Sequence, residues 1–545
     1  MRLIWLDINA SYSHSSLALP ALHAQLTDYQ SETLVWHVVS GTINSDPSLL
    51  LLEISDFNPD IILSTAWLFN HTFILNLLGR YKRLNPSASI IIGGPEFFGE
   101  NKGYLTTNRF ITAVFRGEGE ESFPLLVDTH FKPSFWNIIP GMCWINESGD
   151  YVDNGEALVS HFSMLKPPET SRFFSWGKHF AQIETSRGCF NSCTFCVSGG
   201  SRKVQNITPS KIRERLNFFF LKGIKEIRVL DRTFNANAER AEELLDVFND
   251  FKGKMRFHLE IHPALLSENV RRKLAMVEPG LLHLEAGLQS LDNNVLIACK
   301  RAGSSEKSVE GVKFLVSLDK FELHVDLIAG LPFYTYAAII EDVKFLLTLG
   351  VEEIQIELLK LLPGTKLKED AYKYEIVYSP TPPYEVLKTS TISVNELHKV
   401  TILSKMIDIW YNNTIWRDTF KKLHQENPTF LEAFLDNVLT NNLLCNRLSQ
   451  ENNGILLYEF CIEYYKKAVF DVASAWVIAG FSLKKGPGKL AEPWIRGISK
   501  ENNPLYNKSE EPNMFNYYYI QGENEKLWFA MDKKDKKGKP AKIYL

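Results

Sequence analysis

Three cysteines stand within eight residues in the segment Glu184-Thr-Ser-Arg-Gly-Cys189-Phe-Asn-Ser-Cys193-Thr-Phe-Cys196, with the spacing C-x3-C-x2-C. The segment follows the strand-like run His179-Phe-Ala-Gln-Ile-Glu-Thr. A strand that runs into a glycine-containing loop lets the backbone curl, so that three thiolates can converge on one point. Soft thiolates in a segment without histidine suit an iron–sulfur cluster or zinc. Three ligands mean that a fourth comes from elsewhere or that one metal position stays open.

A structural zinc site is the alternative interpretation of this segment. It would need a fourth ligand, and the chain has no second C-x-x-C. The other four cysteines are isolated in the sequence: Cys143, Cys299, Cys445 and Cys461. Their isolation disfavours the zinc interpretation.

The cysteine segment resembles that of the radical S-adenosylmethionine (SAM) enzymes, in which C-x3-C-x-aromatic-C holds a [4Fe–4S] cluster by three irons. By this resemblance, Cys189, Cys193 and Cys196 bind the cluster and serve catalysis. The amino and carboxylate groups of SAM chelate the fourth iron. Phe195 is the aromatic residue of the motif, and the resemblance places it against the adenine of SAM.

Composition limits the classes of protein that need considering. The 545 residues suffice for about three or four domains. A formal charge of -4 argues against nucleic acid as a partner. Seven cysteines, three of them clustered, do not resemble a disulfide framework. The N-terminus turns polar too soon for a signal peptide, and no apolar run is long enough to span a membrane. We therefore expect a cytoplasmic protein, as an oxygen-sensitive cluster would require.

Residues 1–130 alternate short apolar runs with segments of helical periodicity. The predicted strands are Leu3–Ile8, Leu34–Val39, Ile61–Thr65, Ser89–Ile92 and Ala113–Phe115, and the predicted helices are Leu17–Leu26, Leu49–Ile54 and Thr72–Leu84. This alternation predicts an α/β, doubly wound, flavodoxin-like domain that binds ligands in the loops at the carboxyl ends of its strands.

Those loops resemble the cobalamin-binding domain that precedes many radical SAM domains. They include Ser64-Thr-Ala-Trp67, Gly93-Gly94-Pro95-Glu96 and Arg116-Gly117-Glu118-Gly119-Glu120. A Gly-Gly loop lets backbone approach a large ligand closely. The resemblance implies that cobalamin contacts come from Ser64, Thr65, Gly93, Gly94, Glu118 and Gly119. The alternative is a flavodoxin-like domain that has lost its cofactor.

The sequence departs from cobalamin-binding domains in one respect, because it contains no D-x-H-x-x-G motif. The nearest match, Asp128-Thr-His130, has Pro133 in place of the glycine. We therefore expect no histidine ligand to cobalt, as is common in this subfamily. His14, in the loop after the first strand, could face a cofactor or cap the following helix through solvent.

Residues 131–178 read as a linker with a small ribbon around Met142–Val152. Residues 179–390 then show six strands separated by helix-length stretches. The strands are Phe180–Thr185, Lys225–Leu230, Arg256–Ile261, Leu281–Ala286, Leu323–Ile328 and Glu353–Leu359. Six such units fit the partial (β/α)6 barrel of the radical SAM family, whose sites lie at the carboxyl ends of the strands.

Polar residues follow these strands in an order that recurs in the family. Glu260-Ile-His262-Pro263 resembles the Glu-x-x-Pro segment near the SAM ribose, and Arg301 would pair with the SAM carboxylate. The predicted SAM contacts are Phe195, Asp231, Glu260, Glu285, Gln289, Ser290, Arg301 and Gly330. Glu260 and Glu285 could instead be ion-pair partners of Arg301 or His262. His258 and His262 enclose Glu260 on one strand face, which favours site lining over a second metal.

Residues 391–545 read as a mostly helical extension that shapes the substrate pocket. Its predicted helices are Leu397–Thr414, Trp416–His424, Thr429–Asn441 and Gly454–Ala473, followed by strands Phe515–Ile520 and Lys526–Met531 and a solvated tail, Lys533–Lys542. The aromatic stripe of these helices predicts core. The segment also resembles an uncharacterised extension on some cobalamin-dependent radical SAM enzymes.

The resemblance as a whole implies three cofactors: a [4Fe–4S] cluster, SAM and cobalamin. The reduced cluster would cleave SAM to a 5′-deoxyadenosyl radical, and methylcobalamin would methylate an unactivated carbon. A flavodoxin- or ferredoxin-type protein would donate the electron. The alternatives are a non-methylating rearrangement, ring contraction or cyclisation, or a non-catalytic Fe–S carrier or sensor. Small-molecule, lipid and peptide substrates all stay open, as does the oligomeric state.

Overall fold

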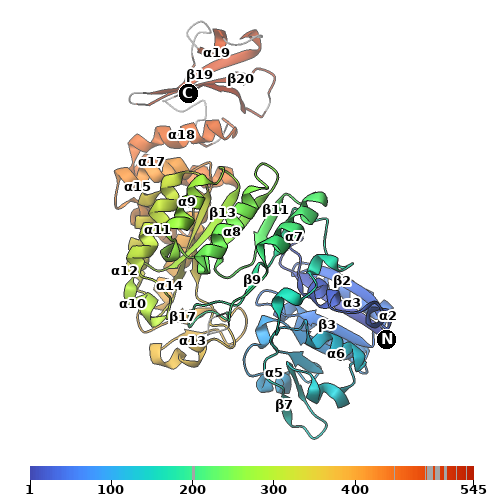
Figure 1. The fold of residues 1–545 in the computed structure, drawn as a ribbon. Helices are drawn as coiled ribbons and strands as arrows, with labels where there is room; N and C mark the ends of the chain where they lie inside the picture. The colour runs from blue at the N-terminus through green and yellow to red at the C-terminus, as the bar shows by residue number, and fades with distance from the viewer. Residues whose placement is uncertain are drawn as a thin grey trace. The chain divides into compact units, whose positions relative to one another are not determined.

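The structure is a computed structural model, shown in Figure 1. It describes residues 1–198, 203–446, 448–484, 486–487, 495–497, 504–507, 512–522, 525–535 and 537–544. The chain divides into two compact units. The first comprises Met1–Glu322, Gly330–Tyr334 and Leu358–Ser393, and the second comprises Leu323–Ala329, Thr335–Glu357 and Val394–Leu545.

The first unit begins with a seven-stranded sheet of order β2-β1-β3-β4-β5-β6-β7. Its strands are β1 Arg2–Asn9, β2 Val35–Thr42, β3 Ile61–Thr65, β4 Ser89–Gly93, β5 Ala113–Phe115, β6 Met142–Ile145 and β7 Tyr151–Asp153. Neighbours among β1 to β5 are parallel. The order 2-1-3-4-5 is that of flavodoxin-like domains, so the predicted doubly wound fold and its five strands are confirmed.

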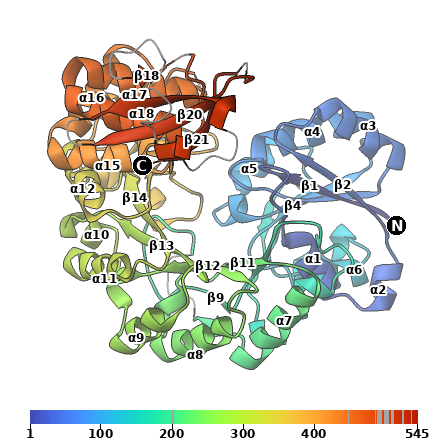
Figure 2. The ribbon, with the colours of Figure 1, turned by 90° about the horizontal axis from the view of Figure 1, so that it is seen from above.

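Both faces of this sheet are covered by helices, because successive side chains of a strand point to opposite faces. Leu3 and Trp5 pack in one buried cluster with residues of α1 and α6, while Ile4 and Ile8 pack in another with residues of α3 and α4. Figure 2 shows α3 and α4 on one side of the sheet and α1 and α6 on the other. The helices are α1 Ala18–Ala24, α2 Asp28–Glu32, α3 Pro47–Phe57, α4 His71–Leu84, α5 Lys102–Thr107 and α6 Ser122–Asp128.

The ribbon predicted around Met142–Val152 is present, but it completes the first sheet and is no part of a separate connector. Strand β6 pairs antiparallel with β5, and β7 pairs with β6. Met142 and Cys143 are fully buried, one in each of the two core clusters. A ribbon with two buried faces is part of a core, so the first sheet continues past residue 130.

The central sheet has six strands in the order β15-β14-β13-β12-β11-β8. They are β8 Phe180–Ile183, β11 Glu226–Val229, β12 Arg256–Ile261, β13 Leu282–Gln289, β14 Glu322–Ala329 and β15 Glu353–Leu358. β8, β11, β12 and β13 are parallel neighbours. All six predicted strands are confirmed. The helices between them are α7 Pro209–Leu221, α8 Ala238–Asn249, α9 Glu268–Met276, α10 Asn293–Ala298, α11 Ser305–Leu318 and α12 Tyr336–Leu349.

The C-terminal part of the second unit is helical and then antiparallel. Its elements are α14 Val394–Met406, a π-helical turn η8 Ile407–Tyr411, α15 Arg417–Glu426, α16 Phe430–Thr440, α17 Gln450–Tyr464, α18 Val469–Ile478, β18 Ile495–Gly497, α19 Pro504–Asn507, β19 Phe515–Gln521, β20 Lys526–Asp532 and β21 Pro540–Tyr544. The last four strands form one sheet. Within the described residues, no helix has both the length and the apolar character needed to cross a membrane.

One prediction for this part was wrong in detail. The single helix predicted over Gly454–Ala473 is two helices, because a 3-10 turn at Lys466–Ala468 separates α17 from α18. The lysine-rich tail is exposed at Lys533, Lys534, Lys537 and Lys539, as predicted, and its last residues belong to β21, which pairs antiparallel with β20. Backbone pairing places these residues in a strand despite their hydrophilic composition. The predicted aromatic core is confirmed, since Trp410, Trp416 and Trp476 are fully buried.

Candidate functional site

The cysteine loop leaves the carboxyl end of β8 and is closed at its base by a short ribbon. Ser186–Arg187 (β9) pairs antiparallel with Gln205–Asn206 (β10). Gly188 has a φ of 96°, a conformation that side chains rarely adopt, and the chain turns there into the loop. Of the three cysteines, Cys189 and Cys193 are buried and Cys196 is partly exposed, as is Phe195.

Asp231, at the end of β11, anchors the start of this loop. Its Oδ1 accepts the backbone N–H groups of Thr185 at 2.7 Å and Ser186 at 2.8 Å, and its Oδ2 accepts the Thr185 hydroxyl. Arg240 donates to the carbonyl and hydroxyl of the same threonine. Both carboxylate oxygens are thus used within the protein. Direct contact of Asp231 with SAM stays a prediction.

The loop is held from its other side by the end of α10. The amide of Thr194 donates to the carbonyl of Cys299 at 2.9 Å, and the amide of Ala302 donates to Asn191 Oδ1 at 3.1 Å. Arg301 places Nη1 3.9 Å from Cys193 Sγ and donates through Nη2 to the carbonyl of Gly287. The residue predicted to pair with the SAM carboxylate therefore lies beside a predicted cluster ligand.

The thiols of this loop lie close enough to influence one another. Burial raises the pKa of Cys193, Arg301 lowers it in part, and Cys196 and Cys189 raise it again. Among the described residues, no three His, Cys, Asp or Glu side chains are arranged around one metal ion. The expected convergence on one point is therefore absent from this structure. A cubane cluster does not require it, because each cysteine binds a different iron.

Among the described residues, Cys299 is the cysteine outside the motif that the fold brings to the loop, and sequence spacing gave no sign of this. It is 1% exposed, and burial, followed by the charge of Cys193, raises its pKa to about 12.

Polar side chains line one face of β12 and β13. Glu260 and Glu285 are direct register partners on these strands. Burial, followed by the charge of Glu285, raises the pKa of Glu260 to about 7. Glu285 is held by His258, whose Nε2 lies 3.0 Å from Glu285 Oε2. The predicted alternative of an ion pair with Arg301 or His262 is thus replaced by a pair with His258.

Two predicted SAM contacts follow β13. Gln289 has a φ of 70°, and its Oε1 is buried without a hydrogen-bond partner in the described part of the chain. An unpaired buried acceptor is costly unless a ligand or water satisfies it. Ser290 is fully buried, and its hydroxyl accepts the amide of Asp292 at 3.0 Å. Gln289 therefore fits a ligand-facing role better than Ser290 does.

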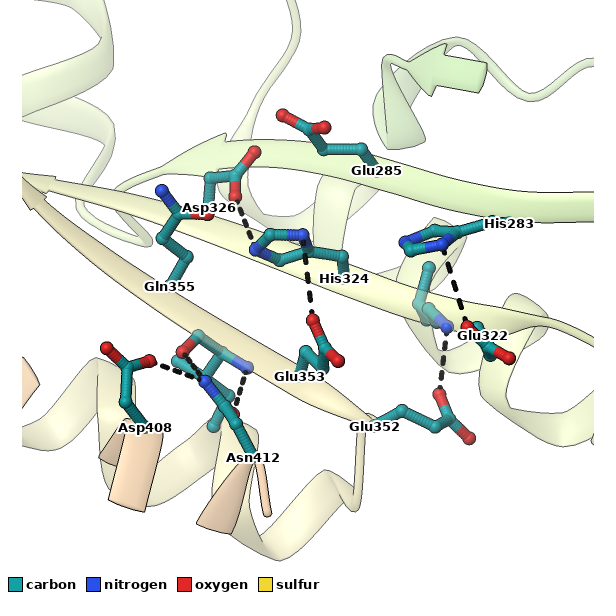
Figure 3. A network of polar contacts seen from close by, with 12 residues as sticks. His283, Glu285, Glu322, His324, Asp326, Glu352, Glu353, Gln355, Asp408 and Asn412 are labelled. Atoms are coloured by element: carbon teal, nitrogen blue, oxygen red, sulfur yellow. Dashed lines mark hydrogen bonds and ion pairs between the residues drawn. The ribbon is translucent and has the colours of Figure 1, made fainter. Parts of the chain in front are cut away.

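Histidine–carboxylate pairs continue along the strands that follow (Figure 3). His283 Nδ1 lies 3.6 Å from Glu322 Oε2 in the first unit. In the second unit, His324 Nε2 lies 3.2 Å from Asp326 Oδ1 and His324 Nδ1 lies 4.0 Å from Glu353 Oε2. Asn412, beyond the π-helical turn, donates to the carbonyl of Ile354 and accepts its amide, so it closes part of the edge of β15.

The loops of the first sheet show which predicted cobalamin residues are already engaged. Ser64 is buried and donates to the carbonyl of Leu6 at 2.8 Å, and Glu118 Oε2 accepts the amide of Val159 at 2.6 Å. Gly93 and Thr65 are register partners on β4 and β3. Gly94 has a φ of 112°, and a Cβ there would lie 2.5 Å from the carbonyl oxygen of Ala66. Gly94 thus permits a close approach of two loops.

A Cβ on Gly119 would lie 2.9 Å from the Leu22 side chain of α1, so the close packing at this position also favours glycine. The N-cap of the following helix is Leu17, and it makes no side-chain capping bond. His14 Nδ1 lies 2.8 Å from Ser11 Oγ on the exposed loop after β1. Both alternatives for His14, a cofactor-facing role and capping through solvent, stay predictions.

The loop after β3 is held by hydrogen bonds and carries two exposed aromatic rings. Asn70, 1% exposed, donates to the carbonyls of Ile8 and Thr65 and accepts the amide of Trp67 at 2.7 Å. The loop is therefore fixed, yet Trp67 is 39% exposed and Phe69 45% exposed, with nearly parallel rings. Exposed aromatics on a fixed loop at the ligand-binding edge of a doubly wound sheet are typical of a binding surface.

A cavity of about 250 Å³ lies in the first unit, beside the residues that precede the loop cysteines. Its lining includes residues of α1 and α7 and the charged residues Glu120, Glu184, Arg187 and Arg215, but none of the three loop cysteines. Arg187 pairs with Glu120 at 2.8 Å and Glu184 at 2.6 Å. Because none of the three loop cysteines lines this cavity, we place the candidate site at the cysteine loop and not in the cavity.

Comparison with known families identifies the central part of the chain. Residues 183–346 match the model of the radical SAM superfamily, beginning at the end of β8 and including all three loop cysteines and Arg301. Residues 183–346 are a radical SAM domain. Residues 372–492 match a second family model, which is described only as a protein of unknown function. The resemblance seen in the sequence is confirmed for the radical SAM domain.

Relatives support the same family. An uncharacterized methyltransferase of Pyrococcus horikoshii, PH0819, is 26% identical over 289 residues, which are 51% of this chain and 62% of the relative. The chain matches between 46% and 62% of the length of its curated relatives.

Two solved structures share the fold at low identity. TsrM, a radical S-adenosylmethionine methyltransferase from Kitasatospora setae, has a TM-score of 0.53 and 19% identity, covering 70% of this chain and 77% of its own. OxsB, a cobalamin-dependent S-adenosylmethionine radical enzyme solved with aqua-cobalamin, has a TM-score of 0.58 and 15% identity, covering 87% of this chain and 79% of its own. The likeness to OxsB extends well beyond the radical SAM domain.

Proposed function

We propose that this chain is a cobalamin-dependent radical SAM enzyme that methylates an unactivated carbon. The observation that carries the proposal is a radical SAM domain with its C-x3-C-x2-C loop, preceded by a sheet of flavodoxin-like order. Support for cobalamin comes from the fold shared with OxsB and TsrM, whose structures contain it. Support for methylation comes from the methyltransferase names of TsrM and PH0819.

The residues present fit the three cofactors. When bound, the cluster supplies the electron that cleaves SAM to methionine and a 5′-deoxyadenosyl radical, and cobalamin supplies the methyl group. Cys189, Cys193 and Cys196 would hold the cluster as thiolates. Arg301, beside Cys193, would orient the SAM carboxylate, because a guanidinium can bind a carboxylate through two parallel hydrogen bonds.

Glu260 and Gln289 would contact SAM from β12 and β13. A carboxyl group with a pKa near 7 can donate or accept a hydrogen bond near neutral pH. The unpartnered Gln289 Oε1 would accept a hydrogen bond from the same ligand. The loops at Thr65, Gly93-Gly94 and Gly119 would receive cobalamin through backbone, with no histidine ligand supplied by a D-x-H-x-x-G motif.

The proposal names the substrate and the electron donor only by their chemical class. A small molecule, lipid or peptide would enter a pocket shaped by the C-terminal residues 391–545, because that part has no cofactor role in the resemblance. A flavodoxin- or ferredoxin-type protein would reduce the cluster.

The test is anaerobic reconstitution of the full chain with iron, sulfide and hydroxocobalamin, followed by desalting, metal analysis and a visible spectrum. We expect about four iron atoms per chain, as one cubane requires, together with retained corrin absorption. Iron without corrin would overturn the cobalamin assignment. Absence of iron would overturn the radical SAM assignment itself.

A non-methylating radical reaction is the second candidate, and one observation favours it. OxsB covers more of this chain than TsrM does, and it is described as a radical enzyme and not as a methyltransferase. SAM labelled in its methyl group separates the two candidates. Label recovered in a product supports methylation, whereas unlabelled product with 5′-deoxyadenosine supports rearrangement, ring contraction or cyclisation. If the reconstituted chain does not cleave SAM, the remaining candidate is a non-catalytic Fe–S carrier or sensor.

A further inference from the structure

Residues 359–388, here called the strap, follow β15; they begin after the radical SAM match and extend into the second matched region, which starts at residue 372. The strap contains α13 Lys366–Glu369, a 3-10 turn Ala371–Tyr374 and the antiparallel pair β16 Val377–Tyr378 and β17 Val386–Lys388 (α13 and β17 in Figure 1). The whole strap belongs to the first unit. It contacts three separate loops, each of which the proposed function assigns to a different cofactor.

The first contact is with the cysteine loop. The amide of Leu367 donates to the carbonyl of Thr194 at 2.8 Å. Thr194 lies between Cys193 and Phe195, and its own amide is bound by Cys299 on the other side. The centre of the cluster loop is therefore held from two directions by backbone hydrogen bonds, one of which comes from the strap.

The second contact is with the loop after β14, where the adenine of SAM is expected. Gly330 has a φ of 92°, and a Cβ there would lie 3.5 Å from both Leu359 and Val386 of the strap. In the same loop, the ring of Phe333 meets that of Tyr374 edge-on, with centroids 5.7 Å apart. Side chains from both ends and the middle of the strap thus enclose this loop.

The third contact is with the Gly93-Gly94-Pro95-Glu96 loop, where cobalamin is expected. The hydroxyl of Tyr384 donates to Glu96 Oε2 at 2.8 Å, across 288 residues of sequence. Glu96 is only 8% exposed. Close by, a Cβ on Gly364 would lie 2.9 Å from the backbone of Phe98, so the two chains run against each other there.

The Glu96 contact belongs to a small polar cluster in which Glu96 is buried and its neighbours are partly exposed. Lys368 Nζ lies 4.8 Å from the centre of the Tyr384 ring. Burial raises the pKa of Glu96, whereas the Tyr384 hydrogen bond and Lys368 lower it. Tyr104 of α5 also faces Glu96 and is influenced by its charge. Tyr384 itself has a φ of 56°, a conformation that a bulky residue keeps only where its surroundings hold it.

We infer that the strap fixes the spacing of the cluster, SAM and cobalamin loops, and that Tyr384 is a positioning residue that acts through Glu96 on the Gly93-Gly94 loop. This inference rests on the proposed function. Transfer of a group between cofactors requires placement within a fraction of an ångström, which separate loops do not maintain unless a further element holds them together. The strap is the described segment that contacts all three.

The test uses the full chain with its cluster reconstituted, and the probe is hydroxocobalamin titrated under anaerobic conditions. Tyr384→Phe removes only the hydroxyl and leaves the buried Glu96 carboxylate without its donor. We expect the Kd for hydroxocobalamin to rise about tenfold, with iron content unchanged. Tyr372→Phe is the matched control, because Tyr372 lies on the strap but is 75% exposed, and it should leave the Kd unchanged.

The Glu96→Gln background separates positioning from a general structural effect. There the acceptor is neutral, so adding Tyr384→Phe should raise the Kd less than threefold. In the otherwise unchanged chain, the effect of Tyr384→Phe should also shrink as the pH falls and Glu96, faced by Lys368, Tyr384 and Tyr104, becomes protonated.

The outcomes are distinct. A Kd for Tyr384→Phe within twofold of the unchanged chain overturns the inference while leaving the proposed function intact. An equal tenfold effect in the Glu96→Gln background also overturns it, since Tyr384 would then act by another route. If the unchanged chain binds no cobalamin at all, both the proposed function and the strap's role fall together.

Discussion

Replacing Asp231 distinguishes an anchor of the cysteine loop from a direct SAM ligand. Asp231 is 2% exposed and accepts three hydrogen bonds, two from backbone amides and one from the Thr185 hydroxyl. Asp231→Ala leaves two buried N–H groups unpaired, at about 1–3 kcal/mol each, so we expect a loss of roughly 2–6 kcal/mol. In Asp231→Asn, the remaining oxygen can accept both amides while its NH2 donates to the hydroxyl, and the expected loss is about 1–2 kcal/mol.

The assay combines thermal unfolding of the full chain with iron content after reconstitution. Asp231→Ala should unfold several degrees lower and retain less iron, with Asp231→Asn between it and the unchanged chain. Asp246→Asn is the control, because Asp246 pairs with Lys273 at the surface and its loss should cost less than about 0.5 kcal/mol. The reasoning is refuted if Asp231→Ala keeps its stability and iron but binds SAM at least tenfold more weakly.

Three further predictions concern the cofactors. Cys189→Ala should abolish cluster retention measured as iron per chain, whereas Cys461→Ala, at a buried cysteine of the second unit, should retain the iron. In the folded chain the pKa of Glu260 is raised from 4.5 to about 7, so Glu260 binds its proton more tightly when the chain is folded. The free energy of unfolding should therefore fall between pH 4.5 and 7, by at most about 3 kcal/mol. Glu260→Gln should flatten that fall in a pH series of unfolding midpoints. Trp67→Ala should raise the Kd for hydroxocobalamin about tenfold. Tyr29→Ala, at a tyrosine 78% exposed on α2, is the control and should leave the Kd unchanged. Equal effects of the two substitutions would show that Trp67 is not part of the cobalamin-binding surface.

Local periodicity was enough to predict the strands of both parallel sheets. A strand such as Ile61–Thr65 is a continuous apolar run between turn residues, and it is buried on both faces of its sheet. The sequence predicted the class of each sheet, whereas the order of its strands came from the structure. The ribbon at Met142–Val152 was visible for the same reason, but pairing of β6 with β5 depends on contacts that no local pattern records.

The site was predictable where chemistry depends on spacing and not where it depends on the fold. The spacing of the cysteines identified the loop, whereas the engagement of Asp231 and Glu118 with backbone amides could not be read from strand-end motifs. A carboxylate at the end of a strand can face a ligand or a neighbouring loop with the same sequence around it. The role of the strap could not be predicted from the sequence, because its contacts join residues as far apart in the chain as Glu96 and Tyr384.

The polar face of β12 and β13 divides into two parts, and the division supports the location proposed for SAM. Toward the amino ends of these strands, His258 is paired with Glu285 and His283 with Glu322. At the carboxyl end of β13, Gln289 Oε1 has no hydrogen-bond partner among the described residues. Paired groups stabilise the fold without a ligand, whereas unpaired ones need a polar partner to offset their burial. A ligand rich in hydrogen-bonding groups, at the strand ends beside Arg301, would supply that partner, as a SAM molecule chelated to the cluster would.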